Sequence, residues 1–323
     1  MSDPQTSLLV RVARKRVEAQ DICSLDLVAE PGHVLPAFSA GAHIDVHLPN
    51  GLVRQYSLCN SPGNPAHYQI GVLRDAGSRG GSQAVHDAVS EGSTLHISAP
   101  KNHFPLAKDA AHHLLLAGGI GITPLLAMAE QLARDGASFE LHHASRSRER
   151  TAFVERMAGA SFAQRVHHHF DDGDAAQKLD IAALLQQATP GTHLYTCGPK
   201  GFMDAVLGTA RAQGWPEARL HFEFFGAAPV DTSGDGSFEL EIASTGQVIV
   251  VKADQTALTA LQAAGLDIPM SCEQGVCGTC LTGVKAGTPD HRDLYLTAEE
   301  KAGNDQFLPC CSRACSARLV LDL

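Results

Sequence analysis

Near its C-terminus the chain carries a C-x4-C-x2-C run, a spacing that few protein folds accommodate. Its cysteines are Cys272, Cys277 and Cys280, and Gly275 and Gly278 lie between them. Thiolates are soft, anionic donors that can hold two ferric ions, and glycines let a loop wrap closely enough for backbone N–H groups to reach the sulfurs. Zinc sites favour paired C-x2-C knuckles instead. The spacing therefore predicts a plant-type 2Fe-2S cluster.

A cluster of this type needs a fourth thiolate. Cys310 lies about thirty residues beyond Cys280, and Cys311 and Cys315 follow it closely, so the three compete for this role. Structural disulfides are rare in a reducing compartment. The gathering of six of the nine cysteines beyond residue 270 therefore favours metal chemistry over disulfide pairing.

The 323 residues suffice for two or three domains, each with an apolar core of its own. A formal charge of 25 − 35 = −10, without a long basic run, argues against binding to nucleic acid or to an anionic membrane surface. No apolar run reaches membrane-spanning length, and the N-terminus lacks the pattern of a signal peptide. We expect a cytoplasmic monomer.

The pattern of the chain changes at three places. Residues 1–105 alternate short apolar runs with Gly, Pro and Asn turns, which predicts an antiparallel β-barrel or sandwich. Residues 106–226 alternate strand-like and helix-like runs, which predicts an α/β domain with a parallel sheet. Residues 227–236 have the composition of a linker. Residues 237–323, which contain the clustered cysteines, are expected to form a third domain.

A glycine-rich loop follows the apolar strand-like run that ends near residue 117. Its glycines are Gly118, Gly119 and Gly121, and Thr123 and Pro124 follow as the expected N-cap and first residue of a helix. Glycines permit close approach of a dinucleotide, and a helix N-terminus favours its negative charge. The alternative interpretation is an ordinary turn between a strand and a helix.

A second tight loop supports the nucleotide interpretation. Cys197, Gly198 and Pro199 end a later strand-like run, just before a helix-like run at 202–211. Loops at the carboxyl edge of a parallel sheet are where nucleotides bind. No basic group adjoins Cys197 in the sequence, so we do not expect a reactive thiol.

Two stretches of the first domain carry groups that suit a flavin. One is a strand-like run that offers a cation, an aromatic ring and a hydroxyl; its residues are Arg54, Tyr56, Ser57 and Leu58. The other combines a guanidinium, flexible backbone and a hydroxyl, as a cradle for a single phosphate does; its residues are Arg79, Gly80, Gly81 and Ser82. Taken alone, each is also compatible with a plain strand or surface turn.

In order along the chain, these motifs resemble those of the phthalate dioxygenase reductase family, which includes the vanillate O-demethylase reductases. The resemblance covers nearly the whole chain. It rests on the segments R-x-Y-S-L, R-G-G-S, G-G-I-G-I-T-P, C-G-P and S-C-E-Q-G-V-C-G-T-C. The family's C-x-S-R-A ending matches the chain from Cys310 to Ala314, and this match selects Cys310 as the fourth cluster ligand.

The resemblance implies an FMN domain with a ferredoxin-reductase-like barrel, an NAD domain and a C-terminal β-grasp ferredoxin. The monophosphate cradle implies FMN and not FAD. Phe225 is expected to cover the flavin near the nicotinamide, and Thr123 and Cys197 to position the cofactors. The implied reaction moves a hydride from NADH to the flavin and then single electrons through the cluster to a Rieske-type oxygenase. A cytochrome or a carnitine-type monooxygenase is the alternative acceptor.

The coenzyme contacts are expected after the strand that ends near residue 144. Ser145 and Arg146 stand where folds of this type meet the adenosine ribose, and an arginine there can accept a 2′-phosphate. The resemblance favours NADH, which we expect to be the coenzyme.

Two further patterns bear on partners and metals. From residue 237 onward the charge is 6 − 11 = −5, which suggests docking to a basic partner. Neighbouring histidines occur at 112–113, 142–143 and 167–169. Because adjacent residues of a strand point to opposite faces, we expect locally packed or solvated imidazoles there and no metal site.

Overall fold

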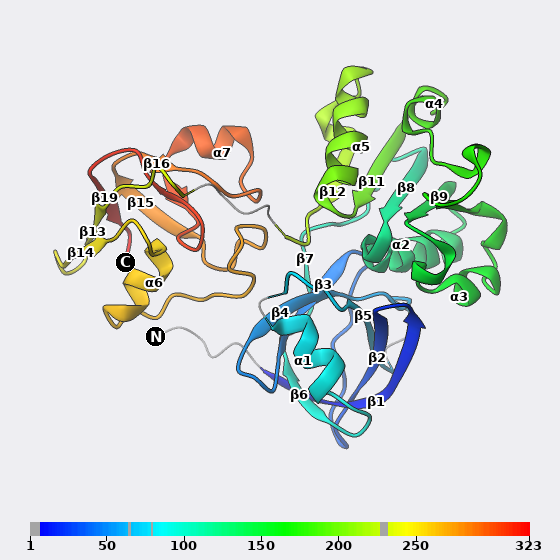
Figure 1. Ribbon diagram of the computed structural model, residues 1–323, viewed down its shortest axis with the longest axis horizontal. Coiled ribbons are helices and arrows are strands. Elements are labelled where there is room, and N and C mark those ends of the chain that lie inside the picture. Colours follow the sequence, from blue (N-terminus) through cyan, green and yellow to red (C-terminus); the bar gives the residue numbers. More distant parts are fainter. Residues whose placement is uncertain (1–6, 64–65, 79, 227–231) are drawn as a thin grey trace. The chain divides into compact units, whose positions relative to one another are not determined.

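The first part of the first strand alternates buried and exposed side chains, as a sheet with one face on a core requires. In β1 (Leu8–Ala19), Val10 and Val12 are fully buried while Leu9 is 43% exposed. The computed structural model describes residues 7–63, 66–78, 80–226 and 232–323 (Figure 1). The chain divides into two units, one ending at Phe225 and one beginning at Gly226.

The first unit opens with a seven-stranded antiparallel sheet, in the order β4-β3-β6-β1-β2-β5, with β7 paired to β3. An isolated bridge between Leu58, just after β4, and Ile70 of β5 joins the two ends of this order, so the sheet curves around its core. The remaining elements are β2 (Ile22–Ala29), β3 (Ala42–His47), β4 (Val53–Ser57), β5 (Tyr68–Leu73), α1 (Gly81–Ala88), β6 (Thr94–Ile97) and β7 (Lys101–Asn102).

A five-stranded parallel sheet follows in the same unit, with the order β10-β9-β8-β11-β12. Its elements are β8 (His112–Gly118), α2 (Ile122–Arg134), β9 (Phe139–Ser145), α3 (Val154–Ala158), β10 (Val166–Phe170), α4 (Ile181–Gln186), β11 (Thr192–Cys197), α5 (Lys200–Ala212) and β12 (Leu220–Glu223). Helices α2 and α3 pack on the face that carries Leu115, and α4 and α5 on the face that carries Leu114. The order reverses between β8 and β11, the place where open α/β sheets bind ligands.

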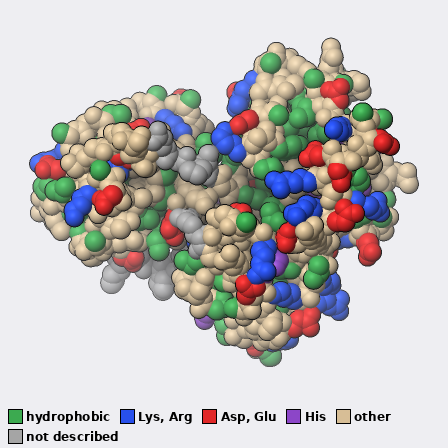
Figure 2. All heavy atoms as spheres, in the orientation of Figure 1, with side chains coloured by type: hydrophobic (Ala, Val, Ile, Leu, Met, Phe, Trp, Pro, Cys, Tyr) green, Lys and Arg blue, Asp and Glu red, His purple; other side chains and the backbone are tan. Residues whose placement is uncertain are grey.

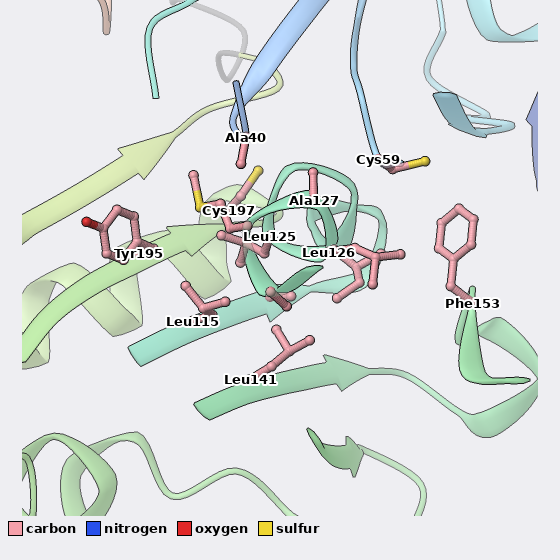
Figure 3. Close-up of a cluster of buried hydrophobic side chains, with 14 of the residues drawn as sticks. Ala40, Cys59, Leu115, Leu125, Leu126, Ala127, Leu141, Phe153, Tyr195 and Cys197 are labelled. Carbon is pink, nitrogen blue, oxygen red and sulfur yellow. The ribbon is translucent and has the colours of Figure 1, made fainter. Parts of the chain in front are cut away.

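The two sheets of the first unit share apolar contacts. The buried cluster in Figure 3 joins Leu115 and Leu141 of the parallel sheet to Ala40 and Cys59 of the antiparallel part. Arg156 adds polar contacts, because its guanidinium donates to the carbonyl of Cys59 at 2.9 Å. The parallel sheet is therefore held against the antiparallel part of the first unit.

The second unit contains a five-stranded mixed sheet, ordered β14-β13-β19-β15-β17, and a two-stranded ribbon of β16 and β18. Its elements are β13 (Phe238–Ile242), β14 (Val248–Val251), α6 (Ala257–Ala263), β15 (Thr282–Ala286), β16 (Pro289–Asp290), α7 (Ala298–Gly303), β17 (Gln306–Phe307), β18 (Arg313–Ala314) and β19 (Arg318–Leu321). Helix α6 buries Leu258 and Leu261 against the sheet, and Thr256 caps its N-terminus. The expected multidomain fold is confirmed.

One local prediction is wrong. Thr123 is not the N-cap of α2, because the preceding glycines form a turn of 3₁₀-helix at Gly119–Gly121 that runs directly into the helix. Helix α2 begins at Ile122, so Pro124 is not its first residue, and the Thr123 hydroxyl donates to the carbonyl of Ile120 at 3.0 Å. The expected linker at 227–236 lies partly outside the described residues.

The surface carries mixed charge. On the face drawn in Figure 2, acidic and basic side chains are interspersed over both units. Within the described ranges, every helix is too short or too polar to cross a membrane.

Candidate functional site

The two predicted nucleotide loops lie against each other at the point where the strand order reverses. A Cβ on Gly121 would fall 2.1 Å from the carbonyl oxygen of Cys197, and one on Gly118 would fall 2.8 Å from the ring of Phe202. Any larger residue would therefore separate the loops. Gly119 needs glycine for a different reason, since its φ is +52°.

At the ends of β11 and β12 a thiol and a carboxyl lie side by side. The parallel register pairs Cys197 with Glu223, so both side chains point to the same face. Burial raises the pKa of the Cys197 thiol well above its usual value, and the nearby Glu223 charge raises it further. Cys197 is fully buried and remains a neutral thiol, which suits a packing or positioning role.

Glu223 connects this edge to the expected flavin strand. The Ser57 hydroxyl, at the end of β4, donates to Glu223 Oε2 at 3.2 Å. Burial raises the pKa of Glu223 to about 7, and the hydrogen bond from Ser57 opposes part of that rise. Glu223 was not predicted from the sequence, where its one signal is an acidic residue inside the apolar run Phe222 to Phe225.

The expected phosphate cradle begins helix α1. A Cβ on Gly81 would lie 2.7 Å from Arg54 Nε, so the guanidinium lies directly beside the first turn of α1. Gly80 has φ +92°, a left-handed conformation that favours glycine. Arg79 lies outside the described residues. A cation beside a helix N-terminus fits a phosphate.

The other residues predicted to bind the flavin differ in how deeply they are buried. The Leu58 side chain is fully buried in the core of the antiparallel sheet, so it packs there and does not reach the cradle. Tyr56 is half-buried against the same core. The Ser82 hydroxyl accepts from the backbone N–H of Asp75 at 3.1 Å and thereby fixes the loop before α1.

The residues expected to contact the coenzyme follow β9 or lie at its end. The hydroxyls of Ser145 and Thr151 are hydrogen-bonded at 2.6 Å, so the Ser145 hydroxyl already has a partner within the protein. Arg146 is exposed. Phe225, expected to cover the flavin, is 42% exposed at the end of the first unit.

In the second unit, the predicted cluster loop brings its sulfurs together. The sulfurs of Cys272 and Cys280 each lie within hydrogen-bonding reach of Cys310. Neighbouring thiols and then backbone N–H groups lower the pKa of Cys272, and one of these donors is the Gln274 N–H at 3.3 Å. The Thr279 N–H similarly points to the sulfur of Cys277 at 3.5 Å. Such a set of anion-stabilising donors fits a cluster bound by thiolates.

The loop glycines are closely packed, and the two remaining cysteines differ in burial. A Cβ on Gly278 would overlap the Tyr295 ring at 2.2 Å, and one on Gly275 would lie 2.4 Å from Cys311 Sγ. Cys311 Sγ therefore lies against Gly275, and it is also within hydrogen-bonding reach of Cys310. Cys315 is exposed. The assignment of Cys310 as the fourth ligand stays a prediction.

Comparison with known proteins places this arrangement in a family. The chain is 58% identical over 313 residues to a vanillate O-demethylase oxidoreductase of Pseudomonas putida, covering 97% of this chain and 98% of the relative. It is 40% identical to the phthalate dioxygenase reductase of Burkholderia cepacia over the full length of both. The chain belongs to the phthalate dioxygenase reductase family.

The structural comparison agrees with this membership. A phthalate dioxygenase reductase, described as a modular structure for electron transfer from pyridine nucleotides to [2Fe-2S], matches with a TM-score of 0.77 and 40% identity, covering 98% of each chain. The family model of the 2Fe-2S iron-sulfur cluster binding domain matches residues 240–315. A second model, the N-terminal domain of dimethylamine monooxygenase subunit DmmA-like proteins, matches residues 98–220.

As a member of the phthalate dioxygenase reductase family, the chain is an oxidoreductase that serves an oxygenase system. Its cofactors are FMN, a 2Fe-2S cluster and NADH, as the sequence predicted. Electrons pass from the pyridine nucleotide through the flavin to the cluster.

Proposed function

We propose that this reductase delivers single electrons to a Rieske-type oxygenase that demethylates a methoxylated aromatic acid of the vanillate class. The observation that carries the proposal is end-to-end similarity, at 57% and 58% identity, to two vanillate O-demethylase oxidoreductases. Because each alignment covers 97% of this chain, the cluster domain is included as well as the flavin and nucleotide domains. We expect the chain to act as a cytoplasmic monomer.

The test is reconstitution. The purified reductase, NADH and a vanillate O-demethylase oxygenase should form formaldehyde and demethylated product in step with NADH consumption. Omitting either protein should stop product formation. If the reductase reduces cytochrome c rapidly but supports no demethylation by that oxygenase, the proposal is wrong.

Flavin binding is assigned to the cradle at α1. FMN, when bound, accepts a hydride from NADH and releases the two electrons one at a time. Its phosphate would meet Arg54 and the first turn of α1, together with Arg79, Gly80, Gly81 and Ser82. Charge-assisted hydrogen bonds from guanidinium groups hold a phosphate in a fixed orientation.

Nucleotide binding is assigned to the paired loops at Gly118–Pro124 and Cys197–Pro199. The absence of side chains at Gly118 and Gly121 permits the close approach that a dinucleotide needs. Thr123 and Cys197 are buried and position these loops. Phe225 would cover the flavin until the nicotinamide arrives.

The pair of Ser57 and Glu223 is assigned to proton handling beside the flavin. A carboxyl with a pKa near 7 changes its protonation state readily at neutral pH, so it can hold or release a proton when the charge nearby changes. Ser57 connects this carboxyl to the expected flavin strand. Neither side chain needs to act as a nucleophile.

Electron transfer to the partner is assigned to the cluster end of the second unit. Three apolar side chains are exposed around the cluster loop, Met270, Leu281 and Leu294, at 45%, 39% and 41%. The backbone N–H of Leu294 donates to Gly275 and that of Leu281 to Gly278, both at 3.0 Å, so two of the three are fixed to the loop. A small apolar patch within a segment of charge 6 − 11 = −5 suits a partner with an apolar centre and a basic rim.

A haem-containing acceptor is a second candidate. A type IV self-sufficient cytochrome P450 monooxygenase matches with a TM-score of 0.85 and 39% identity, covering 98% of this chain and 41% of that one. A heme-dependent oxidative N-demethylase beta subunit of Ectopseudomonas mendocina is 42% identical over 90% of each chain. NADH-dependent reduction of a haem partner faster than that of the Rieske oxygenase would favour this candidate.

A further inference from the structure

Four polar side chains converge on one face of the sheet edge formed by β9 and β10. The parallel register pairs His167 with His142. Alternate residues of a strand share a face, so Glu140 joins His142, and His169 joins His167. Consecutive histidines do diverge, as expected: His143 bonds instead to the carbonyl of Gly119 at 2.9 Å. The convergence therefore arises across the two strands and not between neighbours on one strand.

A chain of hydrogen bonds fixes the tautomer of His142. The carbonyl of Gln177 can only accept, so His169 Nδ1, at 3.0 Å from it, carries the proton and leaves His169 Nε2 as an acceptor. His142 Nδ1 lies 3.0 Å from that acceptor and must therefore donate to it. Because Nδ1 carries the proton of the imidazole, His142 Nε2 is left with the lone pair.

This lone pair has no hydrogen-bond partner and faces another acceptor. His142 is 7% exposed, and its Nε2 is shielded from solvent without a donor. Glu140 Oε2 lies 3.6 Å from it. Two electron-rich atoms at this distance repel unless a cation lies between them. One ligand atom each from Glu140, His142 and His167 lie within 4.8 Å of one another.

We propose that Glu140, His142 and His167 bind a divalent transition-metal ion of the Zn²⁺ class. Two imidazole nitrogens and one carboxylate oxygen form a ligand set that such ions prefer. His169 acts through His142, because its hydrogen bond orients the ring and directs Nε2 to the ion, as outer partners of metal-bound histidines do.

Binding requires the His167 ring to rotate, because it stacks on the His142 ring with centroids 4.7 Å apart and planes 21° apart. A tetrahedral ion with bonds of about 2.0–2.1 Å holds its ligands about 3.3 Å apart. His142 is fixed by His169, whereas the Glu140 side chain is 47% exposed and His167 is also exposed, so these two can rotate inward. Three protein ligands leave the fourth position to water. The bound ion would tie the edge strand β10 to β9.

The experiment measures zinc uptake by the holoprotein, with FMN bound and the cluster loaded so that its cysteines are not available. After equilibration with Zn²⁺ and desalting, the parent should retain one zinc per chain. Zinc K-edge absorption should show nitrogen and oxygen neighbours at about 2.0–2.1 Å and none of the sulfur neighbours expected at about 2.3 Å. Sulfur coordination alone would overturn the proposal.

Variants locate the ion. Glu140→Gln and His167→Ala alter exposed side chains, so folding should be preserved, and each should weaken zinc binding at least tenfold. His169→Ala should weaken it by about 10- to 100-fold through loss of orientation. His221→Gln is the matched control, because His193 Nδ1 and His221 Nε2 form a similar stacked pair at 2.9 Å without a third ligand in the described residues. Unchanged zinc affinity in both Glu140→Gln and His167→Ala would contradict the site.

A second readout needs no activity measurement. Zinc at about a hundredfold excess over its dissociation constant should raise the melting temperature of the parent by roughly 5 °C and slow amide exchange in β10. The His167→Ala variant should show neither change. Equal shifts in parent and variant would mean that the ion binds elsewhere.

Discussion

Ser57 donates a hydrogen bond to Glu223 and thereby joins the antiparallel and parallel sheets of the first unit, with Ser57 Oγ 3.2 Å from Glu223 Oε2. Glu223 in turn lies in register with Cys197 on the adjacent strand. The expected flavin strand and the nucleotide loops therefore meet at a carboxyl whose pKa burial raises to about 7.

The free energy of unfolding should depend on the protonation state of Glu223. Its pKa rises from 4.5 to about 7 on folding, so between these values the folded chain holds a proton that the unfolded chain has lost. The contribution of Glu223 to stability is therefore fully present below about pH 4.5 and is lost as pH rises through 7. Glu223→Gln cannot ionise. The stability of the parent relative to this variant, measured by urea unfolding, should fall between about pH 5 and about pH 8. A difference that does not change with pH would contradict the buried-carboxyl account.

Removing the hydrogen-bond donor should move the titration upward. Ser57 stabilises the charged form of Glu223, so Ser57→Ala should raise the pKa of Glu223 further. A hydrogen bond to a charged group contributes roughly 1.5–3 kcal/mol when buried and less at a half-buried site, so we expect a shift of about one pH unit. The pH profile of flavin reduction by NADH, followed by stopped flow, should shift to higher pH accordingly. An unchanged profile would show that Glu223 does not influence this step.

The choice of Cys310 over its neighbour can be tested by a matched pair of variants. Cys310→Ser should abolish the visible absorption of the cluster and leave FMN bound, because the Cys310 sulfur lies within reach of Cys272 and Cys280. Cys311→Ser should retain the cluster, since the Cys311 sulfur lies against Gly275, whereas Cys272 and Cys280 both have Cys310 as a partner. The reverse outcome would reassign the ligand.

Flavin affinity tests the phosphate cradle. Arg79→Ala should weaken FMN binding about ten- to a hundredfold, the loss of one charge-assisted hydrogen bond of roughly 1.5–3 kcal/mol. Arg74→Ala is the control, because this nearby arginine forms an exposed ion pair with Asp87. Fluorescence titration of the apoflavoprotein measures both. Equal affinity in Arg79→Ala and the parent would mean that this loop has another role.

The sequence was most informative where function is local in the chain. The cluster loop was predictable because Cys272, Cys277 and Cys280 lie within nine residues and their spacing alone restricts the chemistry. The prediction that Thr123 caps α2 was wrong because the glycines before it extend the helix with a 3₁₀ turn. Glycine accepts many backbone conformations, so the sequence does not determine whether the helix continues in this way.

Residues whose role depends on distant partners were missed. Burial raises the pKa of Glu223, and a hydrogen bond from Ser57 opposes part of that rise. Ser57 lies 166 positions away in the chain. The pairing of His142 with His167 likewise depends on the parallel register of β9 and β10. Neither relationship leaves a periodic signal in the sequence.

The central claim is that electrons leave through the second unit to an oxygenase. Its most direct test is the chain truncated near Gly234, which keeps the unit that ends at Phe225. This form should oxidise NADH with ferricyanide, which accepts electrons directly from the flavin, at a rate close to that of the parent. It should support no oxygenase turnover, while the association of the parent with the oxygenase should slow steeply as salt rises. Sustained oxygenase turnover by the truncated form would remove the cluster domain from the electron path and contradict the account.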